Sequence, residues 1–279
     1  MLKRKLLLLL SCALVLFGIS IYSLTWGGED VIVIGSKPDT EQKILSEMVM
    51  CLLRARGYST RHVPELEGTW VCFNALCSGD LGLYIEYSGT ALMAIIKDDP
   101  SSPIEYLREQ LLLRHDLEWL EPLGFQNSYG LFVLKDSPLQ TFSDLKNVSL
   151  GIDPEFNSRS DFALLKEHYG LTLKPTIMDQ SLLFLSQSKV ISASSTDARL
   201  AKYERKPLID DLKILPSYEP AVMARASLLR RYPEIREILA PLKNLISQEE
   251  MIELNARVEN NYEKSYDVAF DFLKKKGLL

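Results

Sequence analysis

The sequence predicts an α/β protein built of two lobes. Short apolar strand segments alternate with segments of helical periodicity from residue 31 onward, and a second alternation begins near residue 148. The chain has 279 residues, which is enough for two compact lobes or one large domain. Apolar residues make up 47% of it and charged residues 25%, as in ordinary globular proteins. These observations together favour two α/β units.

The first alternation opens with VIVIG at 31–35, a continuously apolar strand of the buried parallel kind. Apolar residues then recur at helical spacing until Gly57 ends the helix. We expect strands at 31–35, 60–63 and 81–84 and helices at 40–56, 69–78 and 90–96, the last capped by Thr90. Ligands of such sheets bind beyond the carboxyl ends of the strands, so residues in these turns are candidates for a site.

The rest of the chain continues this alternation and ends in helices. Further strands are expected at 117–120, 131–134, 148–152, 174–177 and 190–193 and near Leu215, with helices at 103–115, 161–169, from 181 and after 196. From 227 onward the pattern is helical throughout, with segments at 227–232, 233–245, 247–258 and 265–276. Ser247 and Glu250 form a capping box at the start of one of these helices.

The amino terminus has the features of an export signal. Three basic residues at 3–5 precede an uncharged apolar run at 6–26. About 20 such residues can span a bilayer, whereas the apolar core of a cleaved signal has about 7–15. Residues 1–26 are expected to be a signal anchor or signal peptide, with the basic end cytoplasmic. Lipidation at Cys12 or cleavage near Gly18 remain open. Each route places the rest on the periplasmic or extracellular face of the cytoplasmic membrane.

Composition and motifs exclude several classes of function. A net charge of -5 without a basic face argues against nucleic-acid binding. The four cysteines are too few and too irregularly spaced for a disulfide scaffold or a zinc site, and the three histidines lie far apart. No HExxH, GxSxG, P-loop or GxGxxG motif occurs. We therefore expect no metal, no cofactor and no enzymatic activity.

Aromatic and polar residues gather instead at the expected strand ends: Lys37, Tyr87, Thr90, Asn127, Tyr129, Arg159 and Tyr218. Each could be an ordinary surface or packing residue. As a set they favour a cleft between two lobes that binds a small molecule with a positive and a negative end, since ring faces attract cations and helix N-termini attract anions.

Six segments carry a resemblance to a known family: GSKPDTEQKIL, GDLGLYIEYSGTAL, WLEPLGFQNSYGL, GIDPEFNSRSD, SSTDARLAKY and EEMIELN. In this order they resemble the substrate-binding proteins of osmoprotectant ABC importers, which take up glycine betaine, choline, carnitine and related quaternary amines. The resemblance implies the two-lobed type II periplasmic binding protein fold, with lobe one at 31–131 plus 219–279 and lobe two at 132–218. It also implies ABC permease subunits as partners.

The resemblance assigns roles to the candidate residues. In these relatives a lysine in the GSK turn, here Lys37, helps to hold the ligand carboxylate together with Thr90 and Arg159. Tyrosines surround the trimethylammonium group, and their positions match Tyr87, Tyr129 and Tyr218. The chemistry agrees with these roles. A quaternary ammonium has no N–H to donate and is selected by ring faces, whereas a carboxylate suits a guanidinium and a helix N-terminus.

Two positions depart from the family pattern. Ser194 stands where the family often has a tyrosine before its STD motif, and Asn127 stands where some relatives have an acidic residue. We expect a box that is more open and less negative than in tight betaine binders, which leaves open which quaternary amine is bound. A membrane-anchored sensor with the same fold is the alternative function, although only residues 1–5 would be cytoplasmic. A hydrolase is a third possibility.

Overall fold

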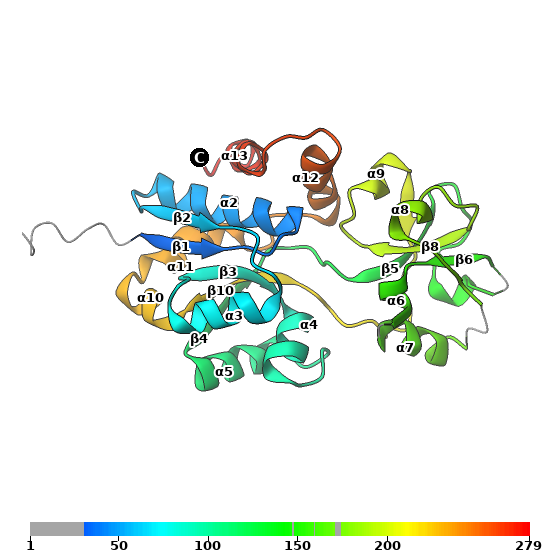
Figure 1. Cartoon of the computed structure of the whole chain (residues 1–279), viewed down its shortest axis with the longest axis horizontal. Helices are drawn as coiled ribbons and strands as arrows, with labels where there is room; N and C mark the ends of the chain where they lie inside the picture. The colour runs from blue at the N-terminus through cyan, green and yellow to red at the C-terminus, as the bar shows by residue number, and fades with distance from the viewer. Residues whose placement is uncertain (1–30, 147, 159, 171–173) are drawn as a thin grey trace, which may run out of the picture.

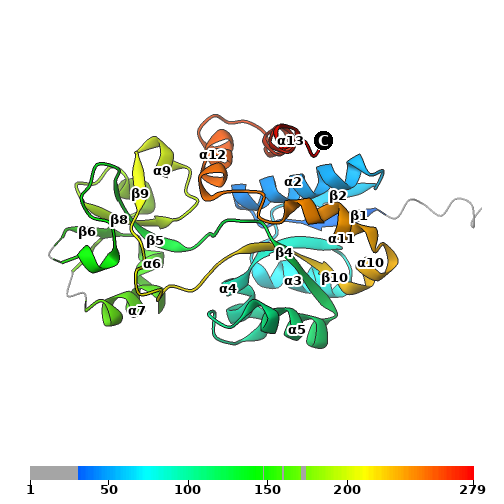
Figure 2. The ribbon, with the colours of Figure 1, turned by 180° about the vertical axis from the view of Figure 1, so that it is seen from behind.

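The computed structural model describes residues 31–146, 148–158, 160–170 and 174–279. In this part of the chain two five-stranded sheets form two lobes, joined by two extended segments (Figures 1 and 2). The expected two-lobed α/β architecture is confirmed. Residues 1–26, expected to be a membrane or signal segment, lie outside the described part. Among the helices that are described, none is both long and apolar enough to cross a membrane.

The first sheet has the strand order β2-β1-β3-β10-β4. Its parallel strands are β1 (Ile32–Gly35), β2 (Thr60–Val63) and β3 (Leu83–Tyr87). Strand β10 (Pro220–Arg225) runs antiparallel to both β3 and β4 (Leu117–Pro122). The carboxyl ends of β1 and β3 therefore meet at one edge, which faces the second lobe (Figure 1).

Strand β10 corrects a prediction, because a strand was expected near Leu215 and none was expected between there and the helical section that begins at 227. Leu215 lies in an extended segment outside any strand, and the strand begins at Pro220. Proline is tolerated at the first residue of a strand, where its missing N–H breaks no inner ladder bond. Val222, Met223 and Ala224 are buried between the two helical layers. Tertiary packing therefore decides which residues form β10.

Helices cover both faces of the first sheet (Figure 1). One face packs against α2 (Thr40–Ala55), α10 (Ala226–Arg231), α11 (Glu234–Leu239), α12 (Gln248–Glu259) and α13 (Ser265–Lys275). The other packs against α3 (Thr69–Ser78), the π-helix Ala91–Ile96 and α5 (Ile104–His115). The helix expected at 233–245 is shorter than predicted, since α11 gives way to a 3-10 turn, Ala240–Leu242, that contains Pro241.

The connection after β3 differs in detail from the prediction. The strand continues to Tyr87 instead of ending at residue 84, and a short helix, α4 (Ser88–Thr90), follows it without a loop. Thr90 therefore lies inside the first helical turn and is not its cap, because Tyr87 occupies the capping position. This direct strand-to-helix junction places Tyr87 and Thr90 at the carboxyl edge of the sheet.

The second sheet has the order β7-β6-β8-β5-β9. Strand β6 (Leu150–Ile152) is parallel to β7 (Thr176–Ile177) and β8 (Val190–Ser194). Strand β5 (Tyr129–Leu134) is antiparallel to β8 and to β9 (Arg205–Pro207). Four short helices flank this sheet: α6 (Pro154–Ser158), α7 (Ser160–His168), α8 (Gln180–Leu183) and α9 (Arg199–Lys202).

Alternate residues of β5 pack on opposite faces of the second sheet, as the period of a strand requires. Leu131 and Val133 join the apolar cluster of Phe156 and Phe162, whereas Phe132 joins the cluster of Leu183, Phe184 and Leu200 on the other face.

The two segments that join the lobes are residues 123–128 and 208–219. They run side by side near the first lobe, where the Asn127 N–H donates to the Tyr218 carbonyl at 3.1 Å. The expected boundary at residue 131 falls inside β5, which belongs to the second sheet from Tyr129 onward. We therefore propose that the first crossing ends at 128, with the second lobe spanning 129–207.

Candidate functional site

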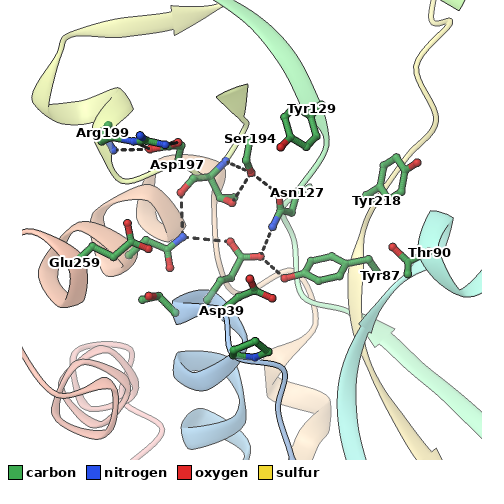
Figure 3. A pocket seen from close by; sticks show the side chains of 15 residues that line it. Asp39, Tyr87, Thr90, Asn127, Tyr129, Ser194, Asp197, Arg199, Tyr218 and Glu259 are labelled. Carbon is green, nitrogen blue, oxygen red and sulfur yellow. Dashed lines mark hydrogen bonds and ion pairs between the residues drawn. The ribbon is translucent and has the colours of Figure 1, made fainter. Parts of the chain in front are cut away.

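A pocket of about 620 Å³ lies between the two lobes, at the edge where β1 and β3 end (Figure 3). Its walls come from the start of α2, the β3–α4 junction, both crossing segments, the end of β8 with the turn after it, and α12. The lining residues are Pro38, Asp39, Thr40, Glu41, Tyr87, Thr90, Asn127, Tyr129, Ser194, Thr196, Asp197, Arg199, Tyr218, Asn255 and Glu259. Six of the eight predicted site residues are among them.

Three tyrosines, from three different segments, line this pocket (Figure 3). Tyr129 stacks on Phe156 with ring centroids 5.4 Å apart and an interplanar angle of 13°, which fixes the ring at the start of β5. Tyr218 packs tightly over Gly89, because a Cβ atom added there would lie 2.7 Å from its Cε1. Tyr87 is buried, and its hydroxyl donates to Glu41. Packing thus holds all three rings in place.

Glu41, in the first turn of α2, is the centre of a polar network. Its Oε1 accepts hydrogen bonds from the Tyr87 hydroxyl and from Asn127 Nδ2 at 3.0 Å. Its Oε2 accepts from Asn255 Nδ2 at 3.2 Å. The Ser194 hydroxyl in turn donates to Asn127 Oδ1. This network connects α2, the first crossing, β8 and α12, and so ties the two lobes together.

Burial decides the protonation behaviour of Glu41. It raises the pKa of the carboxyl above its ordinary value, while hydrogen bonds from Tyr87, Thr196, Asn127 and Asn255 act in the opposite direction. A nearby cation without an acidic proton would stabilise the ionised form of this carboxyl group. The pKa of Glu259, also in the pocket, is likewise raised by burial.

The pocket contains more negative than positive groups. Asp39, Glu41, Asp197 and Glu259 are its carboxyl groups, and Arg199 is its one cationic side chain among the described residues. The Arg199 guanidinium is held by Asp197, with Nε to Oδ1 at 2.9 Å and Nη2 to Oδ2 at 2.6 Å. Asn127, expected to make the box less negative than in tight betaine binders, donates to a carboxylate that comes from α2, and the comparison with those binders stays a prediction.

Lys37 does not line the pocket, contrary to the prediction. Its Nζ forms an ion pair with Glu86 Oε1 at 2.7 Å, and both residues are buried. Glu86 also accepts from the Tyr87 backbone N–H at 2.9 Å. The lysine is thus used inside lobe one to balance a buried carboxylate next to the site. Its ammonium lies 5.9 Å from the centroid of the Tyr87 ring.

The other predicted residues divide into two groups. Thr90, Asn127 and Ser194 line the pocket and are partly buried there. Arg159, expected to hold a carboxylate, lies outside the described residues.

Sequence reasoning missed the acidic residues and Asn255. Glu41 lies within the GSKPDTEQKIL segment, of which only Lys37 was considered as a site residue. Its position just after a strand and at a helix start was a usable signal, because strand-end turns of this kind form binding sites. Asn255 and Glu259 lie one helical turn apart on α12, a spacing that places them on the same helix face.

Comparison with known proteins gives concordant results. Residues 30–275 match the family described as the substrate-binding domain of ABC-type glycine betaine transport systems. An ergothioneine transport permease and binding protein of Helicobacter pylori is 32% identical over 90% of the chain, which spans 48% of that relative's length. A glycine-betaine-binding protein of Pseudomonas aeruginosa is 30% identical, with 88% of each chain covered.

A solved structure agrees with the fold. The crystal structure of a glycine betaine/carnitine/choline ABC transporter component superposes with a TM-score of 0.84 at 28% identity, covering 88% of this chain and 99% of that one. The two-lobed binding-protein architecture expected from the sequence is thereby confirmed.

Proposed function

The chain belongs to the family of substrate-binding domains of ABC-type glycine betaine transport systems, and from this premise we propose that it binds a quaternary amine between its lobes for an ABC importer. The family consists of solute-binding proteins, so the chain is not an enzyme. Its members act outside the cytoplasm, which agrees with the expected export signal. We propose permease subunits as partners and residues 1–26 as the means of export or membrane attachment.

One observation carries the ligand assignment: three fixed tyrosines share a pocket with four carboxyl groups. Glycine betaine, carnitine, choline and ergothioneine all carry a trimethylammonium group, which is a cation without N–H donors. Ring faces and nearby carboxylates attract such a group. A site built of neutral hydrogen-bond acceptors would not suit it, because those acceptors would receive no hydrogen bond from the ligand. We propose that Tyr87, Tyr129 and Tyr218 contact it and that Glu41 supplies the closest negative charge.

For ligands that also carry a carboxylate, we propose that Thr90 and Arg159 hold that group. Thr90 lies in the first turn of the helix after β3, where backbone N–H groups favour an anion. Arg199 is a weaker choice, because Asp197 already occupies its guanidinium. A quaternary amine without a carboxylate, such as choline, should need neither Thr90 nor Arg159.

Calorimetry of the purified full-length chain with choline and glycine betaine tests this assignment. Tyr129→Ala should weaken both ligands by about 2- to 30-fold, since one cation–π contact contributes ~0.5–2 kcal/mol. Tyr262→Ala is the matched control, because that ring is 88% exposed and outside the pocket. Arg159→Ala should weaken glycine betaine and leave choline unchanged. The proposal fails if Tyr129→Ala behaves like the control, or if no quaternary amine binds.

A further inference from the structure

A second cavity, of about 580 Å³, lies on the other side of the crossing segments from the pocket described above. Neighbouring residues of an extended segment point in opposite directions. Asn127 accordingly lines the first pocket, while Gln126 and Ser128 line the second. In the other crossing, Tyr218 lines the first pocket and Glu219 lines the second. The two cavities have no lining residue in common and lie on opposite sides of these crossings.

Helix α12 divides its residues between the two cavities. Asn255 and Glu259 face the first pocket, whereas Gln248, Glu249 and Ile252 face the second. The opposite wall of the second cavity comes from lobe two, through β5, α9 and β9. Of these elements, α9 contacts α12 (Figure 2).

Arg205, the first residue of β9, lines this cavity and is only 8% exposed. Its Nε and Nη1 are completely buried, and within the described residues they have no hydrogen-bond acceptor. Glu219 and Glu249 also line the cavity, but neither is paired with this guanidinium. Burial lowers the pKa of Arg205, although an arginine side chain remains charged at neutral pH. A buried, unpaired cation is costly, and an anion that reached it would remove that cost.

Apolar side chains line the same cavity as this guanidinium. Phe132, Leu200 and Ile252 pack together and contribute to the cavity lining. Lys135 and Lys206 add positive charge, and the Lys206 ammonium also donates to the Ser137 carbonyl at 2.9 Å. The cavity thus combines one buried cation, two further ammonium groups, the two carboxyl groups of Glu219 and Glu249, and an apolar wall.

We propose that this cavity binds a small organic carboxylate with an apolar tail. The carboxylate pairs with the Arg205 guanidinium, and the tail lies against Phe132, Leu200 and Ile252. A free inorganic anion would neutralise the charge but leave the apolar wall in contact with water. A neutral apolar molecule would cover the wall but leave the guanidinium unpaired. Charge and shape together therefore select an amphiphilic anion.

Calorimetry and thermal unfolding of the full-length chain with hexanoate test the proposal. Hexanamide has the same shape without the charge, and acetate has the charge without the tail. We expect hexanoate to bind with one equivalent per chain, also when choline saturates the first pocket, and to bind at least tenfold more tightly than either analogue. Arg205→Met should weaken hexanoate at least tenfold and leave hexanamide unchanged, whereas Arg205→Lys should keep part of the affinity. Arg56→Met, an equal change at an exposed position on the far end of α2, is the control.

The ligand-free variant gives an independent readout. Removing an unpaired buried charge should leave the melting temperature of Arg205→Met equal to or above that of the parent chain, so that lost binding cannot be ascribed to unfolding. The proposal is overturned if hexanoate does not bind, if it competes with choline, or if it binds Arg205→Met as tightly as the parent chain. Equal binding of hexanoate and hexanamide would also overturn it, because the cavity would then be merely apolar.

Discussion

At the scale of single residues, Glu41 controls the electrostatics of the ligand pocket. It is buried, and three side chains from distant parts of the chain donate to its two oxygens. Burial raises its pKa, so part of the carboxyl population is protonated at a pH where an exposed glutamate is fully ionised. A bound quaternary ammonium would favour the ionised form, because opposite charges at short distance attract strongly in a partly dry site.

We therefore expect Glu41→Gln to weaken choline at least tenfold at pH 8 and to reduce the pH dependence seen in the parent chain, leaving the part that comes from Glu259. In the parent chain the affinity should rise with pH as Glu41 ionises and level off above its raised pKa. Calorimetry from pH 5 to 8 measures both effects. Glu109→Gln, on the exposed side of α5, is the control. A parent profile that is flat, or a variant profile that keeps the slope, would assign the charge to another group.

The contribution of Glu41 to folding stability changes with pH in the opposite direction to its contribution to choline affinity. The raised pKa means that the folded ligand-free protein binds the Glu41 proton more tightly than the unfolded chain does. This contribution is fully present below the ordinary value of 4.5 and is lost as pH rises through the folded-state pKa. Ligand-free Glu41→Gln should accordingly be at least as stable as the parent chain at neutral pH.

Lys37 has a structural role in the same neighbourhood. Removing one partner of a buried ion pair leaves the other charge uncompensated, which typically costs about 3–5 kcal/mol. Lys37→Met should therefore lower the free energy of unfolding by about that amount, measured by urea denaturation, because Glu86 is completely buried. The double variant Lys37→Met/Glu86→Gln should recover much of the loss. Unchanged stability with a selective loss of glycine betaine binding would instead restore Lys37 as a ligand residue.

At the scale of elements, α12 and its neighbour α13 differ in how their first turns are capped. Helix α12 begins with a complete capping box, in which the Glu250 N–H donates to Ser247 Oγ at 3.2 Å and the Ser247 N–H donates to Glu250 Oε2 at 3.0 Å. This box, predicted from the sequence, is confirmed. Because α12 carries Asn255 and Glu259, the cap also fixes part of the pocket.

Ser247→Ala should lower the free energy of unfolding by ~0.5–2 kcal/mol, as the loss of a serine cap usually does. Ser265→Ala is the matched control, since Ser265 is the first residue of α13 and the capping position before it is held by Lys264, without a side-chain capping bond. Urea denaturation of both variants measures the difference. Equal stability of the two variants would show that the capping bond contributes nothing to α12.

At the scale of the whole molecule, the position of the pocket between the lobes has a thermodynamic consequence. A ligand that binds only the closed, folded molecule stabilises whatever parts of the chain form its site. The pocket walls come from β3 and α2 in lobe one and from β5 and β8 in lobe two. Binding should therefore protect both lobes, although each has its own apolar clusters.

Hydrogen exchange with mass spectrometry tests this prediction. At 100 times the dissociation constant, choline should slow exchange in the strands of both sheets, up to about 100-fold where exchange requires global unfolding. Peptides covering β1 and β6 represent the two lobes, and the exposed C-terminal end of α13 serves as the internal control. Protection confined to β1 would mean that the ligand binds lobe one alone.

The sequence by itself determined the strand and helix alternation, the capping box of α12 and the placing of Tyr87 and Tyr129 at strand ends. These features follow from local periodicity, or from a resemblance carried by short segments, so they can be read along the chain.

Only the tertiary structure decided which polar groups meet. Glu41 and Asn255 are 214 residues apart, and their contact depends on how α12 packs against α2. Lys37 directly precedes the pocket-lining residues in the sequence. Its ammonium nevertheless pairs with Glu86, because β1 and β3 are neighbours in the sheet. The partner of a charged side chain is set by burial and by long-range packing, which leave no trace in the local spacing of residues.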